Sequence, residues 1–189
     1  MKLLLASKSP RRRELLSRLG IPVVFVDVDV DEVIPPSTPV ELVPSGLALL
    51  KAKGYTCPLE PDEVLVTADT VVALDGKILG KPHSREEAAA MLRSLSGNVH
   101  SVYTGVCLKC NSGQTVFTER TDVCFRQLSE KVIMDYVNEG ACMDKAGAYG
   151  IQDSIGMVGV ERIEGCFYNV VGLPVSRLFK ELNALTPLI

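Results

Sequence analysis

The amino-acid sequence predicts a mixed α/β fold, in which helices flank a sheet that is not purely parallel. Strand-like apolar segments alternate with segments of helical periodicity along the whole chain. Asp75-Gly76 and Asn111-Ser112-Gly113 are typical of tight hairpin turns, which join antiparallel strands. The length of 189 residues and the 47 % share of hydrophobic residues suit a single domain over residues 1–189, built as two joined lobes without a separable linker.

The first third of the chain combines two predicted strands with two predicted helices. Residues 23–31 alternate between apolar and acidic side chains, as in a half-buried strand with one wet face. Pro44 and Gly46 are expected to interrupt the start of the second helix. In order, the elements are a buried strand over 2–6, a helix that Ser9 caps and Gly20 ends, the strand over 23–31, a proline-rich loop over 35–39 and a helix over 47–53.

The remaining two thirds add hairpins and three helices. Residues 64–67 and 71–74 are strand-like, which places Asp69 at the end of an apolar strand. Ser84 with Glu87 three residues later forms a capping box at a helix start. The further elements are a helix over 84–95, strands over 100–110 and 114–127, a helix over 129–138, two strands within 155–171 and a final helix over 173–185.

Charge and hydropathy narrow the class of partner. The net charge of -3 gives the chain as a whole no electrostatic reason to bind nucleic acid or an acidic membrane. No apolar run approaches the ~20 residues that span a bilayer. The short apolar start meets Lys8 and three arginines at once, unlike a secretory signal. We therefore expect a cytoplasmic protein with no nucleic-acid or membrane partner.

The six cysteines are dispersed, and only Cys107 and Cys110 have a spacing seen in metal sites. They lie within a strand-like run, without a second pair of this kind and with only two histidines in the chain. Buried reduced thiols therefore explain the cysteines better than a zinc site does.

The densest group of cations is Ser7-Lys8-Ser9-Pro10-Arg11-Arg12-Arg13, where a strand leads into a helix. A helix N-terminus presents backbone N–H groups and the positive end of the helix dipole, so it attracts anions. Arginine adds a planar fork that matches phosphate oxygens. Because cations in a first helical turn are unfavourable without an anion, the pattern favours a phosphate cradle over a solvated basic turn.

Carboxylates form the second group of candidate functional residues. Asp69 follows an apolar strand, where α/β folds present catalytic groups, although aspartate is also a common turn former. Phosphate chemistry with magnesium uses one or two protein carboxylates. Glu32 fits either solvent or a metal, whereas the aspartates within residues 23–31 are best explained as the wet face of a strand.

Two further segments fit either a ligand or an ordinary loop. Gly80-Lys81-Pro82 is not a Walker P-loop, because proline stands where Ser or Thr would hold magnesium, and Lys81 suits a phosphate contact or a turn. The glycines and alanines of residues 143–152 allow close backbone approach to a ligand, and the Gln152 amide can read a base edge. A tight loop of small residues explains the same composition.

Taken together, these segments resemble the Maf-like nucleoside triphosphate pyrophosphatases. They occur in the order of that family and cover nearly the whole chain. The matching segments are Ala6-Ser7-Lys8-Ser9-Pro10-Arg11-Arg12, Asp31-Glu32, Lys51-Ala52, Ala68-Asp69-Thr70-Val71-Val72, Gly80-Lys81-Pro82, Leu95-Ser96-Gly97, Asp144-Lys145-Ala146-Gly147-Ala148-Tyr149-Gly150-Ile151-Gln152 and Val171-Gly172-Leu173-Pro174.

The resemblance implies a fold like that of the inosine-triphosphate pyrophosphatases, with a mixed sheet between two lobes and the site in a central cleft. It implies hydrolysis of a nucleoside triphosphate to the monophosphate and pyrophosphate, assisted by Mg²⁺ or Mn²⁺. Asp69 would be the catalytic base or a metal ligand, and Glu32 would help to hold the metal. The implied substrate-binding residues are Ser7, Ser9, Arg11, Arg12, Lys51, Thr70, Lys81 and Gln152.

The resemblance implies two branches within this family, one specialised for dTTP and UTP and the other for 7-methyl-GTP. Arg11, Thr70 and Gln152 resemble the pyrimidine branch. Asp153 stands where the family often has Gly, a departure that bears on nucleobase preference. The alternative function is that of a nucleotide-binding regulator of cell division with weak or no catalysis. The resemblance also suggests a homodimer.

Overall fold

The computed structural model describes residues 1–185, which form two compact units, and each unit is described by itself. Unit 1 comprises residues 1–69, 104–119 and 172–185, and unit 2 comprises residues 70–103 and 120–171. The seven strands have the order β2-β1-β3-β5-β6-β7, with β4 paired to β3. They are β1 (Lys2–Ala6), β2 (Val23–Phe25), β3 (Glu63–Leu74), β4 (Lys77–Leu79), β5 (Val99–Cys110), β6 (Gly113–Phe125) and β7 (Val160–Glu164).

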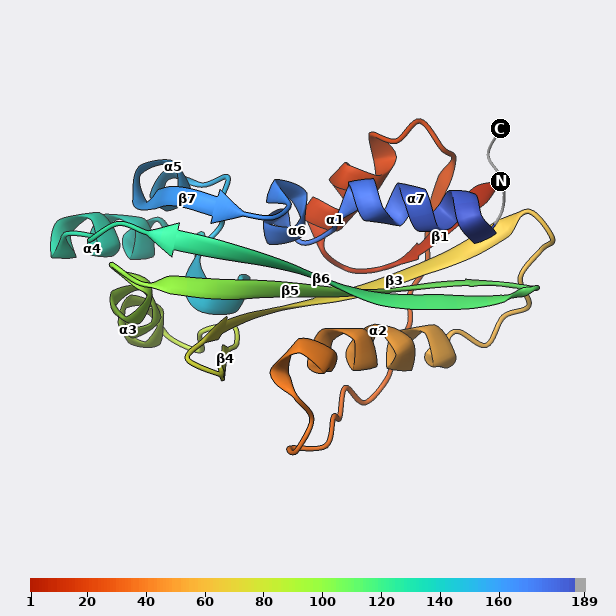
Figure 1. Ribbon diagram of the computed structural model, residues 1–189, viewed down its shortest axis with the longest axis horizontal. Coiled ribbons are helices and arrows are strands. Elements are labelled where there is room, and N and C mark those ends of the chain that lie inside the picture. The colour runs from red at the N-terminus through yellow and green to blue at the C-terminus, as the bar shows by residue number, and fades with distance from the viewer. Residues whose placement is uncertain (186–189) are drawn as a thin grey trace. The chain divides into compact units, whose positions relative to one another are not determined.

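In unit 1, the apolar strand β1 lies between two parallel neighbours. Leu4 is opposite Val24 of β2 and Leu65 of β3. Figure 1 shows helices on opposite faces of these strands, with α2 (Val43–Gly54) on one face and α1 (Pro10–Ser17) and α7 (Val175–Leu185) on the other. The continuous apolar run of β1 follows from this arrangement, because both faces of the strand are covered. The predicted mixed α/β fold is therefore confirmed, as is a sheet that is not purely parallel.

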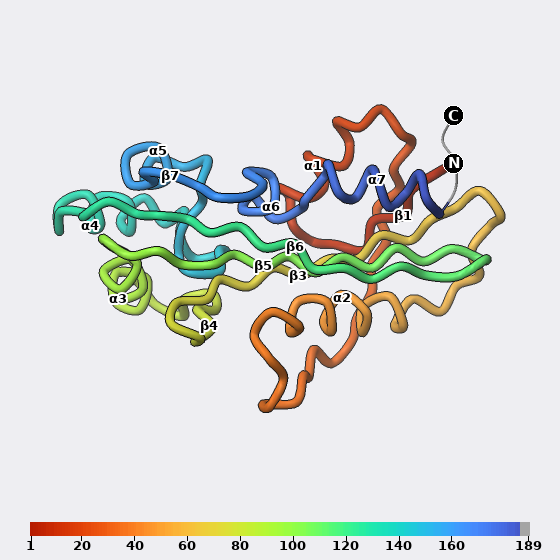
Figure 2. Tube along the Cα trace, viewed as in Figure 1, coloured from red at the N-terminus to blue at the C-terminus, as the bar shows by residue number. Residues whose placement is uncertain are grey.

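The strand predicted over residues 23–31 is wrong beyond Phe25, where β2 ends. Among the described strands β2 lies at the edge of the sheet, and its neighbour β1 ends at Ala6, one residue beyond Leu5, which is opposite Phe25. The chain then passes to the α2 side of the sheet (Figure 2), where Val28 and Val30 approach Gly54 at the end of α2. The valines therefore alternate because they pack against a helix and not because they lie in a strand. The acidic side chains between them are exposed.

Pro44 and Gly46 do not interrupt the helix that carries Lys51, contrary to the prediction. Helix α2 begins at Val43, one turn earlier than expected, and follows directly on the 3₁₀ turn η1 (Val40–Leu42). Proline is tolerated in a first helical turn because its missing N–H has no intrahelical acceptor there. Lys51 is consequently held by continuous helix.

Asp69 lies in the middle of a strand and not at its end, so the prediction of two separate strands over 64–67 and 71–74 is wrong. β3 runs from Glu63 to Leu74 without a break. Its first part pairs with β1 up to Thr67, and its last part pairs with β4 from Val72 onward. Because hydrogen-bonded neighbours are present at both ends, the polar pair Asp69-Thr70 stays within the extended backbone.

In unit 2, two predicted local signals are confirmed. Asp75 and Gly76 both have positive φ and join β3 to β4, as a two-residue hairpin turn requires. Ser84 caps α3 (Arg85–Leu95) by accepting a hydrogen bond from the Glu87 N–H at 3.2 Å, whereas the Glu87 carboxylate accepts from the His83 N–H at 2.7 Å instead of closing the box on Ser84. Ser129 caps α4 (Glu130–Glu139) in the same way, through the Val132 N–H.

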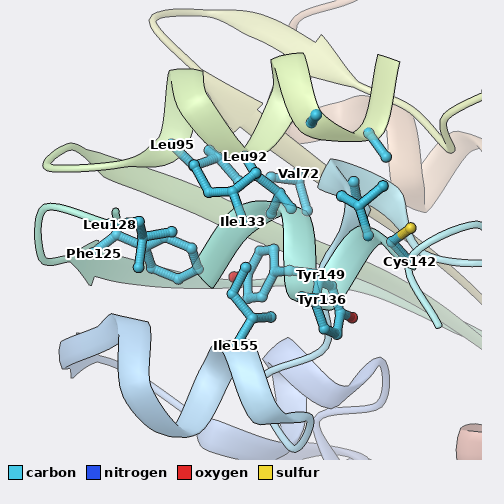
Figure 3. Close-up of a cluster of buried hydrophobic side chains, with 14 of the residues drawn as sticks. Val72, Leu92, Leu95, Phe125, Leu128, Ile133, Tyr136, Cys142, Tyr149 and Ile155 are labelled. Atoms are coloured by element: carbon cyan, nitrogen blue, oxygen red, sulfur yellow. The ribbon is translucent and has the colours of Figure 1, made fainter. Parts of the chain in front are cut away.

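Helices α3, α4 and α5 (Ser154–Gly159) enclose the main core of unit 2 (Figure 3). Leu92 and Ile133 contribute from two of these helices, and Phe125 and Tyr149 stack edge to face at 4.9 Å between ring centroids. Gly147 in the 3₁₀ turn η2 (Ala146–Ala148) has φ +69 and would clash with Val72 if it carried a Cβ. The small residues of this segment therefore serve close packing against β3.

The two strands predicted within residues 155–171 are wrong except for β7. Helix α5 precedes that strand and helix α6 (Phe167–Val171) follows it. Each helix is a single short segment, six and five residues long, so its apolar run is too short for periodicity to separate helix from strand. The final helix α7 begins at Val175, two residues after the predicted start.

All six cysteines are free, but only Cys107 and Cys142 are buried, so the prediction of buried thiols is right for these two. Cys107 and Cys110 lie three positions apart in β5, and side chains at this spacing project to opposite faces of a strand. Burial raises the pKa of Cys107 to about 11, which keeps its thiol protonated. Within residues 1–185, no helix is both long and apolar enough to cross a membrane.

Candidate functional site

The basic turn at the start of α1 uses several of its own backbone N–H groups. Ser9 caps the helix by accepting from the Arg12 N–H at 3.4 Å, and the Ser9 N–H donates to Ser7 Oγ at 3.2 Å. The Arg13 N–H donates to the Ser9 carbonyl, and Pro10 has no N–H to offer. The expected cradle of free backbone donors is therefore reduced, which leaves the side chains as the main candidates for anion contacts.

Arg12 reaches across unit 1 from α1 to two backbone carbonyls. Its Nε donates to Gly172 O at 2.8 Å, and one terminal nitrogen donates to Ala68 O at 3.0 Å and to Ser7 Oγ at 3.5 Å. Burial lowers the pKa of the guanidinium, and the Asp69 carboxylate opposes that shift. Since arginine stays protonated at any ordinary pH, a positive charge is fixed beside Asp69.

Asp69 and Glu32 converge on the ammonium group of Lys51. Lys51 Nζ lies 2.7 Å from Asp69 Oδ1 and 3.3 Å from Glu32 Oε1. The side chains of Lys51 and Asp69 are 16 % and 18 % exposed, whereas that of Glu32 is 50 % exposed. Helix α2 and strand β3 therefore present a partly buried ion pair, and Glu32 joins it from the irregular segment that follows β2.

Arg13 belongs to the predicted phosphate cradle, but the sequence analysis assigned it no individual role. Its Nε donates to the Ser7 carbonyl at 2.9 Å, and its guanidinium lies 4.8 Å from the centre of the Phe25 ring. These two contacts of Arg13 join the Ser7 backbone to strand β2. Three adjacent arginines gave no way to distinguish the one that faces β2 from its neighbours.

In unit 2, the loop that carries Lys81 lies against the glycine-containing turn η2. The Gly147 N–H donates to the Gly80 carbonyl at 3.0 Å. This hydrogen bond joins residues 80–82 to residues 144–152, two of the segments that match the family. The exposed residue Lys81 follows Gly80, and Thr70 lies in β3 directly after Asp69. Lys81, Thr70 and Gln152 thus belong to one unit, and the other predicted site residues belong to unit 1.

A buried polar network holds the backbone next to Gln152. Lys145 Nζ lies 3.3 Å from Asp153 Oδ2 and also donates to the Ala141 carbonyl. The Tyr136 hydroxyl donates to the same Asp153 oxygen at 2.7 Å and accepts from the Gly150 N–H at 3.3 Å. Burial and the neighbouring Asp153 raise the pKa of Tyr136, so its hydroxyl remains a donor.

This network accounts for Asp153, the residue that departs from the family pattern. Its carboxylate is paired within the protein, on the side of Tyr136 and Lys145. A Cβ on Gly150 would lie 2.5 Å from that carboxylate, which explains the glycine at this position. The Gln152 side-chain oxygen is buried and accepts no hydrogen bond from the described residues.

The structure therefore brings together Ser7, Ser9, Arg12, Glu32, Lys51 and Asp69 within unit 1, and Arg11 neighbours Arg12 on the same turn. The sequence analysis missed Gly172 and Ala68, whose carbonyls bind Arg12, and Lys145, which anchors residues 150–153. Carbonyl groups occur at every residue, so no side-chain pattern could have identified the first two.

Comparison with known proteins identifies the family to which the chain is similar. The model of the Maf-like protein family matches residues 2–185. A dTTP/UTP pyrophosphatase of Bacteroides thetaiotaomicron is 50 % identical over 185 residues, covering 97 % of this chain and 96 % of its own. The protein of the same name from Phocaeicola vulgatus is 46 % identical over 185 residues, with the same coverage.

The fold has a relative among solved structures. The Ham1 protein of Staphylococcus aureus superposes with a TM-score of 0.56 at 15 % identity, covering 98 % of this chain and 100 % of that chain. At this level of identity the likeness concerns the fold alone, and it agrees with the mixed sheet flanked by helices. With the family match over nearly its whole length, the chain belongs to the Maf-like proteins.

Proposed function

We propose that this protein is a nucleoside triphosphate pyrophosphatase that hydrolyses dTTP and UTP to the monophosphate and pyrophosphate. The observation that carries this proposal is the convergence of Lys51, Asp69 and Glu32 on one point near the half-buried charge of Arg12. Relatives named dTTP/UTP pyrophosphatase, 45–50 % identical over nearly the whole chain, supply the class of substrate.

The cations of unit 1 suit a polyphosphate. A nucleoside triphosphate carries about four negative charges, and catalysis of phosphoryl transfer is mostly positioning and charge stabilisation. Arg11 and Lys51 would bind phosphate oxygens, with Ser7 and Ser9 as hydroxyl donors at the start of α1. Arg12 would stabilise the phosphate charge mainly through its own positive charge, since its Nε and one terminal nitrogen already bind carbonyls.

A divalent metal ion fits the two carboxylates. Asp69 and Glu32 already share one cationic partner, the Lys51 ammonium, so their oxygens are arranged around a common cation position. Mg²⁺ is usually held by one or two carboxylates together with substrate phosphates, and Mn²⁺ prefers similar oxygen ligands. Glu32 and Asp69 would hold the ion, which would neutralise phosphate charge when bound.

The alternative role of Asp69, with Glu32 holding the ion, is to accept the proton of the attacking water. Its position is fixed by backbone hydrogen bonding in β3 and by the Arg12 contact to the preceding carbonyl, Ala68 O. An 18 % exposed side chain remains within reach of solvent. A general base held in this way contributes about 10²–10⁴-fold to a rate.

Asp69→Asn tests this role. The variant should fold normally, because the amide has the shape of the carboxylate, and its kcat for dTTP should fall by about 10²–10⁴-fold. Pyrophosphate release is measured with Mg²⁺, and circular dichroism monitors folding. Asp27→Asn, at an exposed aspartate of the same unit, is the matched control and should keep the wild-type rate. Wild-type turnover by Asp69→Asn would remove the residue from the mechanism.

Substrate choice is tested by pyrophosphate release from a panel of canonical and modified triphosphates, each with Mg²⁺ and with Mn²⁺. We expect dTTP and UTP to be hydrolysed fastest and 7-methyl-GTP poorly. No release from any of them would favour the nucleotide-binding regulator instead. Several expectations remain predictions from the sequence. They are substrate contacts by Lys81, Thr70 and Gln152, a single domain over 1–189, a cytoplasmic location and a homodimer.

A further inference from the structure

The Lys51 ammonium occupies the position at which two carboxylates meet. It lies 2.7 Å from Asp69 and 3.3 Å from Glu32, so a single positive charge serves both. We propose that Lys51 is an internal competitor of the divalent cation, and that this competition makes metal and nucleotide bind together rather than separately. The inference rests on the proposed function, because it takes Asp69 and Glu32 as the metal ligands.

Electrostatics explains why an internal cation is needed in the absence of ligands. Asp69 and Lys51 are mostly buried and Glu32 is half exposed, and two carboxylates that face each other at such a partly solvated place repel. The ammonium offsets this repulsion and fills the space between them. Helix α2 and strand β3 hold Lys51 and Asp69 by continuous backbone hydrogen bonding, whereas Glu32 lies outside regular structure.

The same arrangement opposes a free metal ion. A divalent cation that takes both carboxylates must deprive the ammonium of its two partners and then lie beside its positive charge. The side chain of Lys51 is only 16 % exposed, so water can replace those partners incompletely. Binding of the metal alone is therefore weakened.

A triphosphate removes this opposition because its oxygens give the ammonium a new partner. The metal ion then takes the carboxylates and Lys51 takes a phosphate oxygen, so every charge remains paired. In thermodynamic terms, the nucleotide raises the affinity for the metal, and the metal raises the affinity for the nucleotide by the same factor. Lys51 is thus a positioning residue for metal loading as well as a phosphate contact.

The test measures Mn²⁺ binding by calorimetry without any nucleotide, on the full-length protein. Lys51→Met removes the competing charge and keeps a side chain of similar length. Its Mn²⁺ affinity should rise by about 5- to 150-fold, the usual range of a coupling between sites. Lys53→Met, at an exposed lysine of the same helix, is the matched control and should stay within about twofold of wild type.

Two further measurements keep the test decisive if Lys51→Met folds poorly. In wild-type protein with ¹⁵N-labelled lysine, the Lys51 Nζ resonance should shift on titration with Mg²⁺ alone, and that of Lys53 should not. In the Glu32→Gln background, which leaves one carboxylate, Lys51→Met should raise the Mn²⁺ affinity less. An unchanged or weaker Mn²⁺ affinity in folded Lys51→Met, or an unmoved Lys51 resonance at saturating Mg²⁺, overturns the inference.

These outcomes are separable from a failure of the proposed function. Tighter Mn²⁺ binding by Lys51→Met, combined with no pyrophosphate release by the wild-type protein, would retain the competition and reject the enzyme. Wild-type release of pyrophosphate from dTTP, combined with an unaltered Mn²⁺ affinity in the variant, would retain the enzyme and reject the competition.

Discussion

At the scale of single residues, Arg12 makes contacts within the protein that its sequence context does not suggest. The sequence predicts a phosphate contact, which stays a prediction, and the structure adds hydrogen bonds from its Nε and a terminal nitrogen to the carbonyls of Gly172 and Ala68. A planar fork with several donors can bind carbonyls of two distant segments at once. Arg12 therefore ties the start of α1 to the residue before Asp69.

Arg12→Lys should weaken both folding and turnover. A lysine ammonium cannot replace the two separate contacts, and hydrogen bonds from charged donors contribute about 1.5–3 kcal/mol each. We expect the free energy of unfolding to fall by about 2–3 kcal/mol, measured by urea denaturation, with a lower kcat for dTTP. Arg18→Lys, at an exposed pair with Glu14, should change stability by less than about 0.5 kcal/mol. Equal stabilities for the two variants would contradict this role.

At the scale of secondary-structure elements, the position of α2 depends on Gly105 in β5. The first turn of the helix lies so close that a Cβ on Gly105 would be 2.1 Å from Ser45 N and 2.4 Å from Pro44 O. Both atoms belong to backbone, which cannot move aside as a side chain can. The close approach lets α2 lie against the sheet and carry Lys51 to Asp69.

Gly105→Ala should therefore displace α2. Overpacking of this kind costs about 1–3 kcal/mol, and the shift should also lower kcat, because Lys51 moves with the helix. Thermal and urea denaturation measure the first effect and pyrophosphate release the second. Gly80→Ala is the control for stability, since no atom lies within 4 Å of its added Cβ. A Gly105→Ala variant as stable and active as wild type would show that α2 tolerates the displacement.

Which elements could be predicted follows from where their signals lie. The caps predicted at Ser9 and Ser84 and the Asp75-Gly76 turn are local, and the structure confirms each of them. The errors lie where packing decides between alternatives. Within residues 1–185, the valine alternation after Phe25 has no strand to pair with, because β1 ends at Ala6, and the apolar segment of α5 is too short to show a helical period.

At the scale of the whole molecule, stability should depend on pH through a buried histidine. His100 contacts the Tyr149 hydroxyl through Nε2 at 2.7 Å, and burial lowers its pKa to about 4. The Asp122 carboxylate opposes this shift. The native state therefore keeps His100 neutral, whereas the unfolded chain takes up a proton near the ordinary pKa of 6.5.

The sign follows from the bound protons. Below pH 6.5 the unfolded state binds a proton that the native state excludes, so stability falls as the pH falls toward about 4. The contribution is about 3 kcal/mol over this interval, at 1.36 kcal/mol per pKa unit. Urea denaturation at several pH values should give a flatter profile for His100→Gln than for wild type. His83→Gln, at an exposed histidine, should keep the wild-type slope, and identical slopes in all three proteins would contradict the prediction.

The sequence by itself determined the mixed α/β class, the helix caps, the hairpins and, through eight ordered segments, the family. These features depend on local residue chemistry and on the order of motifs, and both can be identified from the sequence alone. Only the tertiary structure decided that Asp69 lies within a strand, that Lys51 joins it to Glu32, and that Arg12 binds carbonyls. Contacts between residues far apart in the chain depend on packing and strand pairing, and backbone acceptors have no signature in the side-chain sequence.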